Sequence, residues 1–364
     1  MDDYTWQQKL DERHAKKRRE GFFIFLVLAA VIGTGIWYWF IYTRTPLYAL
    51  EQAQHAIEKQ DGDAFRRYVN LDLLTAKAYD DLTLDLFAYD ATLTPQTKVM
   101  FEKFYMLIKP QMAAGTAATI LDRVENGEWS LPTGTEILKG RQLGIDYERF
   151  LERSQIRNTS FVSLGDIQHQ GTTATAVVNV LDEYTDTPFT LQLVLEESET
   201  GDWQVAYVQN YKDYLNAVAP LQNKDLTEYI AATAEIVTSY NEVFRGYQAE
   251  FQSLAQTGDG ELSENQREAL AKLIEGNVIP ALKKRQQRLN EVPVPKGAAY
   301  LAKQRADCTE VSISAWQHFI LGLKHDNTAE YDTAESLHKL ELEIDLRVED
   351  IIRHTAVSRD IANP

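Results

Sequence analysis

The chain has 364 residues, 44% of them hydrophobic, and a formal net charge of −17 at pH 7. Because the first 20 residues are slightly basic, the negative charge lies on the rest of the chain, where it repels phosphate backbones and argues against nucleic-acid binding. The single cysteine, Cys308, excludes an intrachain disulfide and is expected to be a small buried side chain in a helix.

Residues 21–42 form an apolar run without a charged side chain. A helix of this length measures about 33 Å, which matches the hydrocarbon thickness of a bilayer. Aromatic residues stand at both ends of the run, where they prefer the headgroup level of a membrane. The sequence therefore predicts one transmembrane helix at 21–42, preceded by a cytoplasmic tail at 1–20.

Basic residues set the orientation of this helix. A basic run at 16–19 lies directly before the span, whereas Arg44 is the basic residue that closely follows it. Since Lys and Arg stay on the cytoplasmic side, we expect a single-pass protein of the cell membrane whose bulk is periplasmic or extracellular. The alternative is a signal peptide cleaved near Ala29 and Ala30. Cleavage there would leave an apolar N-terminus, which favours an uncleaved signal anchor.

The first part of the extracytoplasmic region has a helical pattern. Apolar residues recur at helical spacing from Leu47 to Ile57, and Asp61 or Asp63 offers an N-cap for a second helix. Further helices are predicted at 71–89 and at 99–124, the latter after the start signal Thr94-Pro95.

The pattern then changes to a period of two. Short β-branched and aromatic runs predict four strands, at 161–165, 172–180, 188–197 and 202–208. Because the apolar residues alternate, we expect an antiparallel meander with one face on a core and a hairpin at 198–201, closed by a helix that begins near Tyr211. Residues 47–218 are thus predicted to form an α+β domain.

This order of elements resembles a known fold. The short helices carry an AI…D..AF..YV pattern between Ala56 and Val69, and the meander ends in a Gly-Asp-Trp-Gln-Val strand at 201–205. In these features residues 47–218 resemble bacterial envelope families of unknown function that have the cone-shaped fold of nuclear-transport-factor-2-like and cystatin-like proteins. The resemblance implies helices on a curved antiparallel sheet that can enclose an apolar pocket. Some proteins of this fold are isomerases with an acidic base, but none of their catalytic residues is placed here.

Residues 221–357 have a helical pattern throughout. Apolar side chains from Leu226 to Leu254 step by four and three residues in turn, a heptad seam typical of coiled coils. Pro220 is expected to separate this segment from the α+β domain. Further helices are predicted at 263–291, with a kink at Pro280, and at 298–325 and 328–356. Four antiparallel helices of similar length predict an up-down-up-down four-helix bundle, followed by a tail at 358–364.

Charged side chains of the helical segment are the candidate site residues. Lys283, Lys284, Arg285 and Arg288 form a basic stripe, which we interpret first as a solvated face and second as a docking face for an acidic partner such as another envelope protein. The Glu-x-x-His pattern of di-iron bundles, which such a site needs twice, occurs once and ends at His338. We therefore expect no metal and no cofactor.

The sequence carries no catalytic signature: Gly-x-Ser-x-Gly, His-Glu-x-x-His, Cys-x-x-Cys and phosphate-loop motifs are missing. The leading interpretation is a non-catalytic, membrane-anchored envelope protein that binds a partner or builds an assembly. The first alternative is a carrier or sensor of a small apolar ligand, and the second is an isomerase-like enzyme with a buried carboxylate. A filled interior favours the scaffold, an apolar cavity the carrier, and a polar cavity with a buried acid the enzyme. The pattern does not predict the oligomeric state.

Overall fold

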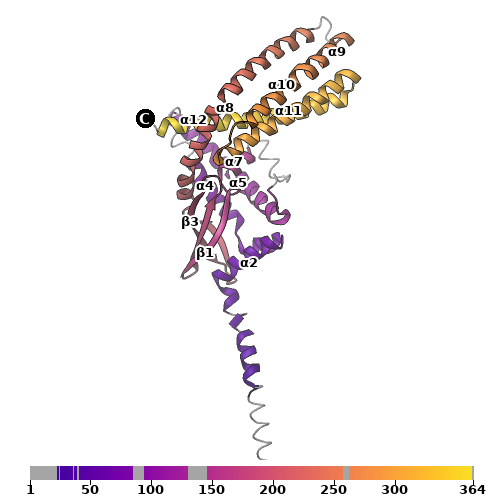
Figure 1. The fold of residues 1–364 in the computed structure, drawn as a ribbon. Coiled ribbons are helices and arrows are strands. Elements are labelled where there is room, and N and C mark those ends of the chain that lie inside the picture. The colour runs from indigo at the N-terminus through magenta and orange to yellow at the C-terminus, as the bar shows by residue number, and fades with distance from the viewer. Residues whose placement is uncertain are drawn as a thin grey trace, which may run out of the picture.

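The structure is a computed structural model that describes residues 23, 25–35, 37–38, 41–84, 94–129, 146–256 and 262–362. Its described part is α+β, with a four-stranded antiparallel sheet and many helices. Figure 1 shows an N-terminal helix that leads away from the sheet region at one end and long C-terminal helices that project from the other end.

The described residues between 23 and 38 are helical and exposed. Across the part of the chain that the structure describes, none of the helices combines the length and the apolar character needed to cross a bilayer. The transmembrane helix predicted at 21–42 lies partly outside the described residues, and the tail at 1–20 lies wholly outside them. Both stay predictions.

The sheet region begins with the 3-10 turn η1 (Tyr42–Arg44) and the helices α2 (Pro46–Glu58), α3 (Gly62–Tyr68), α4 (Leu71–Leu84) and α5 (Pro95–Asn126). Asp61 caps α3, because its carboxylate accepts from the backbone N–H of Ala64 at 2.9 Å. Thr94 caps α5 in the same way through the N–H of Thr97. Both start signals are confirmed, whereas the predicted helix end at 85–89 lies outside the described residues.

The predicted meander is confirmed. After the short helix α7 (Tyr147–Arg153), the chain forms β1 (Thr159–Gln170), β2 (Thr173–Asp182), β3 (Thr187–Glu197) and β4 (Trp203–Val208), paired antiparallel in that order. Along β2 every second side chain, from Ala174 to Asp182, is buried. The buried face lies on a core that also takes residues from α2, α3 and α5, such as Ala53, Phe65 and Val124.

The C-terminal part consists of α8 (Tyr211–Ala255), α9 (Glu264–Leu273), the π-helical turn η2 (Ile274–Val278), α10 (Ile279–Asn290), the 3-10 turn η3 (Lys296–Ala298), α11 (Ala299–His325) and α12 (Thr328–Ala362). The helix starts predicted at 298 and 328 are confirmed to within one residue. A wider π-helical turn stands just before Pro280 and accommodates the missing backbone N–H of proline, while the kink predicted there stays a prediction.

Pro220, which was expected to separate the two regions, lies inside α8, because this helix runs from Tyr211 to Ala255. Proline removes one backbone hydrogen bond, but buried side chains on both sides of it, Val218 and Leu226, hold the helix to its neighbours. The expected boundary between the regions 47–218 and 221–357 therefore falls inside a continuous helix. The division into two domains stays a prediction.

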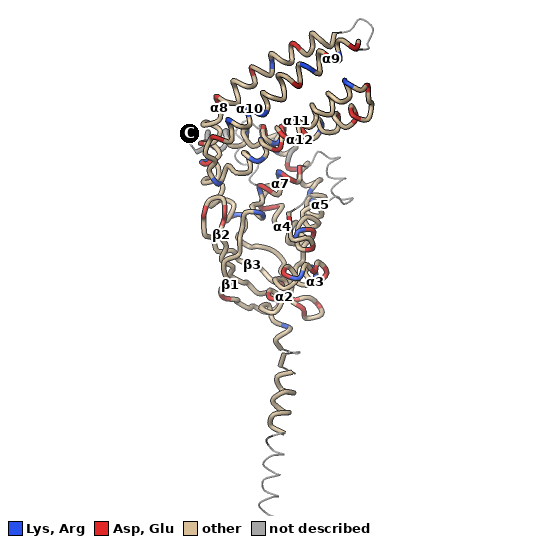
Figure 2. Tube along the Cα trace, turned by 45° about the vertical axis from the view of Figure 1, so that its right-hand side comes forward, with Lys and Arg blue, Asp and Glu red and all other residues tan. Residues whose placement is uncertain are grey.

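Each C-terminal helix packs against two others. Helix α8 lies against the α9–α10 pair and against α12, and α11 lies against the same two neighbours. Three clusters of buried side chains fill the interior of the described helices, around Leu270 and Ile274, around Leu301 and Ile351, and around Tyr240 and Leu289. Acidic and basic residues are interspersed along these helices (Figure 2).

Candidate ligand-binding pocket

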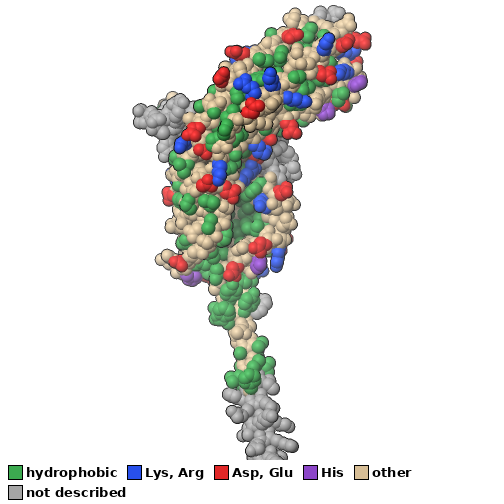
Figure 3. All heavy atoms as spheres, in the orientation of Figure 1, with side chains coloured by type: hydrophobic (Ala, Val, Ile, Leu, Met, Phe, Trp, Pro, Cys, Tyr) green, Lys and Arg blue, Asp and Glu red, His purple; other side chains and the backbone are tan. Residues whose placement is uncertain are grey.

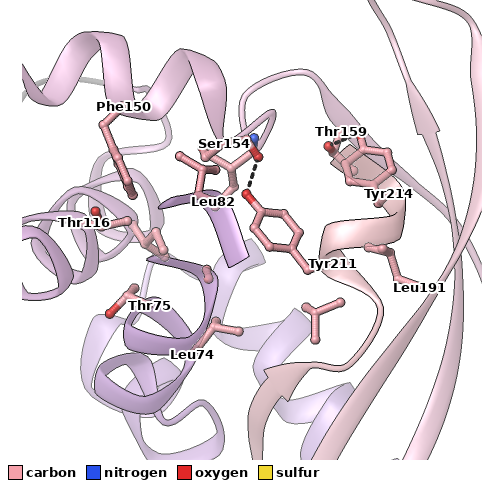
Figure 4. Close-up of a pocket in the computed structure, with 14 residues that line it drawn as sticks. Leu74, Thr75, Leu82, Thr116, Phe150, Ser154, Thr159, Leu191, Tyr211 and Tyr214 are labelled. Atoms are coloured by element: carbon pink, nitrogen blue, oxygen red, sulfur yellow. Dashed lines mark hydrogen bonds between the residues drawn. The ribbon is translucent and has the colours of Figure 1, made fainter. Parts of the chain in front are cut away.

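A cavity of about 180 Å³ lies between the helices and the sheet. Helices α4, α5 and α7 form one wall, and β3, β4 and the first turn of α8 form the other (Figure 4). The apolar side chains of this lining include Leu74, Ala78, Leu82, Phe150, Leu191 and Val208. The cavity is thus a gap left in the core where the helical layer faces the sheet.

Two tyrosines from the first turn of α8 close the cavity on the α8 side. Tyr211 donates a hydrogen bond from its hydroxyl to the backbone carbonyl of Ser154 at 2.7 Å, as Figure 4 shows. The hydroxyl of Tyr214 lies 2.7 Å from Oγ1 of Thr159 and donates to the carboxylate of Asp182 at 3.1 Å. Burial raises the pKa of both tyrosines well above the usual range, so both are neutral. Their hydroxyls are committed to protein partners.

The remaining polar groups of the wall add little polarity. The Thr75 hydroxyl donates to the carbonyl of Leu71 at 2.8 Å, which is a common way for a helical threonine to satisfy its hydroxyl. The hydroxyl of Thr116 is buried and has no hydrogen-bond partner. No carboxylate is among the described residues that line the cavity. The wall is therefore suited to an apolar molecule.

Two buried carboxylates lie close to the cavity but do not line it. Asp182 is fully buried and accepts from the backbone N–H and the hydroxyl of Thr185 at 2.8 and 2.7 Å. Glu152 on α7 is 3% exposed, and its Oε1 has no hydrogen-bond partner. Burial raises the pKa of Glu152 to about 7, although the charges of Arg149 and Arg157 oppose this shift. Glu152 is thus a buried acid outside the pocket.

The structure separates the residues of the predicted basic stripe. Lys283, Lys284 and Arg288 are exposed on α10. Arg285 is not part of this face, because its guanidinium lies 5.5 Å from the ring centroid of Phe244 on α8 and donates to Thr309 on α11 at 3.3 Å. Three consecutive basic residues cannot all face solvent on a helix that packs on two neighbours, so Arg285 is corrected to an interior contact.

The histidine of the single Glu-x-x-His pattern pairs with a neighbouring carboxylate. His338 lies 2.9 Å from Oε2 of Glu341, and both belong to the surface of α12. Among the residues described, no group of three or more His, Cys, Asp or Glu side chains is placed to hold a metal ion. Cys308 is buried, as predicted, and burial raises the pKa of its thiol to about 12, so it is no nucleophile near neutral pH.

Neither a protein-family model, nor a curated protein sequence, nor a solved structure matches this chain. The resemblance of residues 47–218 to a cone-shaped envelope family therefore stays a prediction, and function must be argued from the cavity itself. Sequence reasoning did not name any residue of this cavity as a binding residue. The pair Tyr211 and Tyr214, three residues apart where a helix follows a strand, was a visible signal, but its partners lie far away in the sequence.

Proposed function

We propose that this chain binds a small apolar molecule between its helices and its sheet, and that it works as a carrier or sensor. The observation that carries this proposal is the apolar cavity, in which the tyrosine hydroxyls are already paired. An enzyme of the isomerase type needs its acid in the pocket wall, whereas Glu152 is not among the described residues that line the cavity. A scaffold needs no cavity at all.

The size of the cavity limits the ligand. An engineered protein cavity of about 150 Å³ binds benzene, so the 180 Å³ found here takes an apolar group on the order of six to eight carbons. At about 0.8 kcal/mol for each buried methylene, six carbons contribute about 5 kcal/mol, which corresponds to a Kd of about 0.1 to 1 mM. Binding tests therefore need millimolar ligand.

Binding is tested with hexanol, followed by NMR shifts and by calorimetry. Replacing Ala78, which lines the cavity, by Phe fills the space and should abolish binding. The matched control is Ala232→Phe, which adds the same ring at an exposed position of α8 and should leave binding unchanged. Undiminished hexanol binding by folded Ala78→Phe protein would reject the pocket as the binding site.

The rest of the proposal concerns the location and the helices. We infer that residues 21–42 anchor the chain in the cell membrane with its N-terminus in the cytoplasm, and that α8, α9–α10, α11 and α12 act as an antiparallel four-helix bundle.

A second function, docking of an acidic envelope partner, is favoured by the shared exposure of Lys283, Lys284 and Arg288 on a chain of net charge −17. Crosslinking in native membranes, with these three residues changed to Glu, tests it: an unchanged partner list removes the docking role.

A further inference from the structure

The apolar wall of the cavity continues along the sheet to its open edge. Leu191 of β3, which lines the cavity, pairs with Val178 of β2, and Val178 pairs with Leu164 of β1. Residues directly opposed in an antiparallel sheet point to the same face. Leu164 therefore lies on the same face as the cavity wall.

The next row of the sheet repeats this arrangement. Phe189 pairs with Val180, and Val180 pairs with Phe161 on β1. Phe161 follows Thr159, another residue of the cavity lining, by two positions on the same strand. Alternate residues of a strand share a face, so Phe161 lies on the same face as Thr159, next to the edge of the cavity.

Side chains in these two rows change from buried to exposed toward the edge strand. Val178 and Val180 are 8% and 5% exposed, whereas Leu164 and Phe161 are 37% and 61% exposed. We call Leu164 and Phe161 the edge strip. Figure 3 shows hydrophobic side chains along a hollow between the sheet and the helices.

Polar side chains are found on the opposite face of the same strands. There Asn179 donates to the hydroxyl of Ser163 at 3.0 Å and accepts from the hydroxyl of Thr190 at 2.9 Å. The exposed apolar residues of β1 are Phe161 and Leu164 on the face of the cavity wall, and also Val162, which is 60% exposed at the register shift between Phe161 and Ser163.

We propose that the ligand is a single extended hydrocarbon chain, such as an alkyl or acyl chain of a lipid, with one end in the cavity and the rest on the edge strip. This inference rests on the proposed function. From Leu191 to Leu164 there are two strand spacings, about 10 Å, so the strip adds room for several methylene groups beyond those in the cavity.

A second protein strand is a less suitable occupant of this edge. The pairing of β1 with β2 has two register shifts, between Phe161 and Ser163 and between Leu164 and Ile167. Such bulges interrupt the regular row of backbone groups that an added strand would need. A hydrocarbon chain needs only the apolar side chains.

The test measures Kd for hexanol, octanol, decanol and dodecanol with the full chain in detergent-free nanodiscs. If the chain continues onto the edge strip, affinity should rise about fourfold for each added methylene, without levelling off at the length that fills the cavity. The double variant Phe161→Ser with Leu164→Ser should bind hexanol as the wild type does and lose at least tenfold for dodecanol. The matched control, Leu221→Ser with Val243→Ser, removes two exposed apolar side chains of α8 and should keep the wild-type series.

The outcomes separate this inference from the proposed function. If hexanol binds but the affinity of the wild type stops rising at octanol, the pocket remains the binding site and the proposal of an extended chain is overturned. This result is obtained from the wild type alone. The inference also fails if the edge-strip variant keeps the full rise. If hexanol itself does not bind, the proposed function fails and the inference fails with it.

Discussion

Among single residues, Glu152 has the most unusual environment. Its carboxylate lies on α7 with almost no exposure, near Arg149 and Arg157 and also near two further carboxylates, those of Glu148 and Asp182. Burial is the largest influence and raises its pKa to about 7, from an ordinary value of 4.5. The folded chain therefore holds a proton that the unfolded chain releases at lower pH.

This difference predicts how stability depends on pH. Since the folded pKa is raised, the stabilisation is fully present below pH 4.5 and is lost as the pH rises to about 7. We expect the unfolding free energy to fall by about 3 kcal/mol over this window from Glu152 alone. In Glu152→Gln this part of the fall should vanish, as urea titrations at a series of pH values would show. The exposed Glu183→Gln serves as control, and an unchanged pH profile of Glu152→Gln would contradict the raised pKa.

The adjacent residues Lys284 and Arg285 differ in their environment: the side chain of Lys284 is exposed, whereas that of Arg285 contacts two neighbouring helices. Arg285→Ala removes a ring contact with Phe244 and a hydrogen bond to Thr309, so it should cost about 1 to 3 kcal/mol. Lys284→Ala changes an exposed side chain and should cost about 0.5 kcal/mol or less. Chemical denaturation of the two variants measures the loss of unfolding free energy. An equal loss in both variants would show that Arg285 is a solvated surface residue like Lys284.

At the scale of elements, α7 joins the cavity to the C-terminal helices. Its residue Phe150 lines the cavity, while its other side forms ion pairs with α12. Arg149 donates to Asp350 at 2.9 Å, and Arg347 donates to Asp146, the N-cap of α7, at 2.8 Å. The position of one cavity wall is therefore fixed by the last helix of the chain.

Removing one of these pairs should weaken this connection. Burial raises the pKa of Asp350, but the hydrogen bond and charge of His354, and then those of Arg149, lower it far more and hold it well below the usual range. Asp350→Asn should therefore cost about 1 to 3 kcal/mol at neutral pH. Because the pKa is depressed, this cost should shrink as the pH falls below about 4. Urea unfolding at pH 7 and in acid measures both, with the exposed Glu349→Gln as control. A cost that is independent of pH would exclude the ion pair as its cause.

For the whole molecule, the connection between the sheet and the C-terminal helices is the main structural feature. Helix α8 begins at the cavity with Tyr211 and continues without a break to Ala255. Tyr184, which lies between β2 and β3, packs on the helical core around Leu301. Lys296 donates to Asp186 of the same β2–β3 connection at 2.7 Å. These contacts cross the boundary that was predicted at Pro220.

The sequence predicts a four-helix bundle at residues 221–357, and the contacts bear on whether this segment folds alone. The isolated segment keeps its clusters of buried side chains around Leu270, Leu301 and Leu289 but loses Tyr184, Asp146 and the first turns of α8. We expect it to be helical and monodisperse, with a melting temperature clearly below that of the same helices in the full chain. Circular dichroism of both proteins makes the comparison. An unfolded segment would show that the two parts form one cooperative unit, and an unchanged melting temperature would show that the crossing contacts contribute nothing.

The sequence by itself determined the features that neighbouring residues decide. Asp61 and Thr94 predicted helix starts, because a cap needs only the backbone N–H groups of the next turn. Alternation of apolar residues predicted the meander, because a strand such as β2 buries every second side chain. These rules act within a few residues of the chain, so they can be read without the tertiary structure.

Only the tertiary structure decided the features that depend on distant residues. The cavity depends on residues far apart in the sequence, such as Leu74 of α4 and Leu191 of β3, which both line it, and nothing near either residue indicates this. Arg285 is an interior residue because α8 and α11 both pack on its helix. Pro220 lies within a helix because buried contacts on both sides outweigh its local cost. Burial and packing are sums over the whole fold, and local sequence does not contain them.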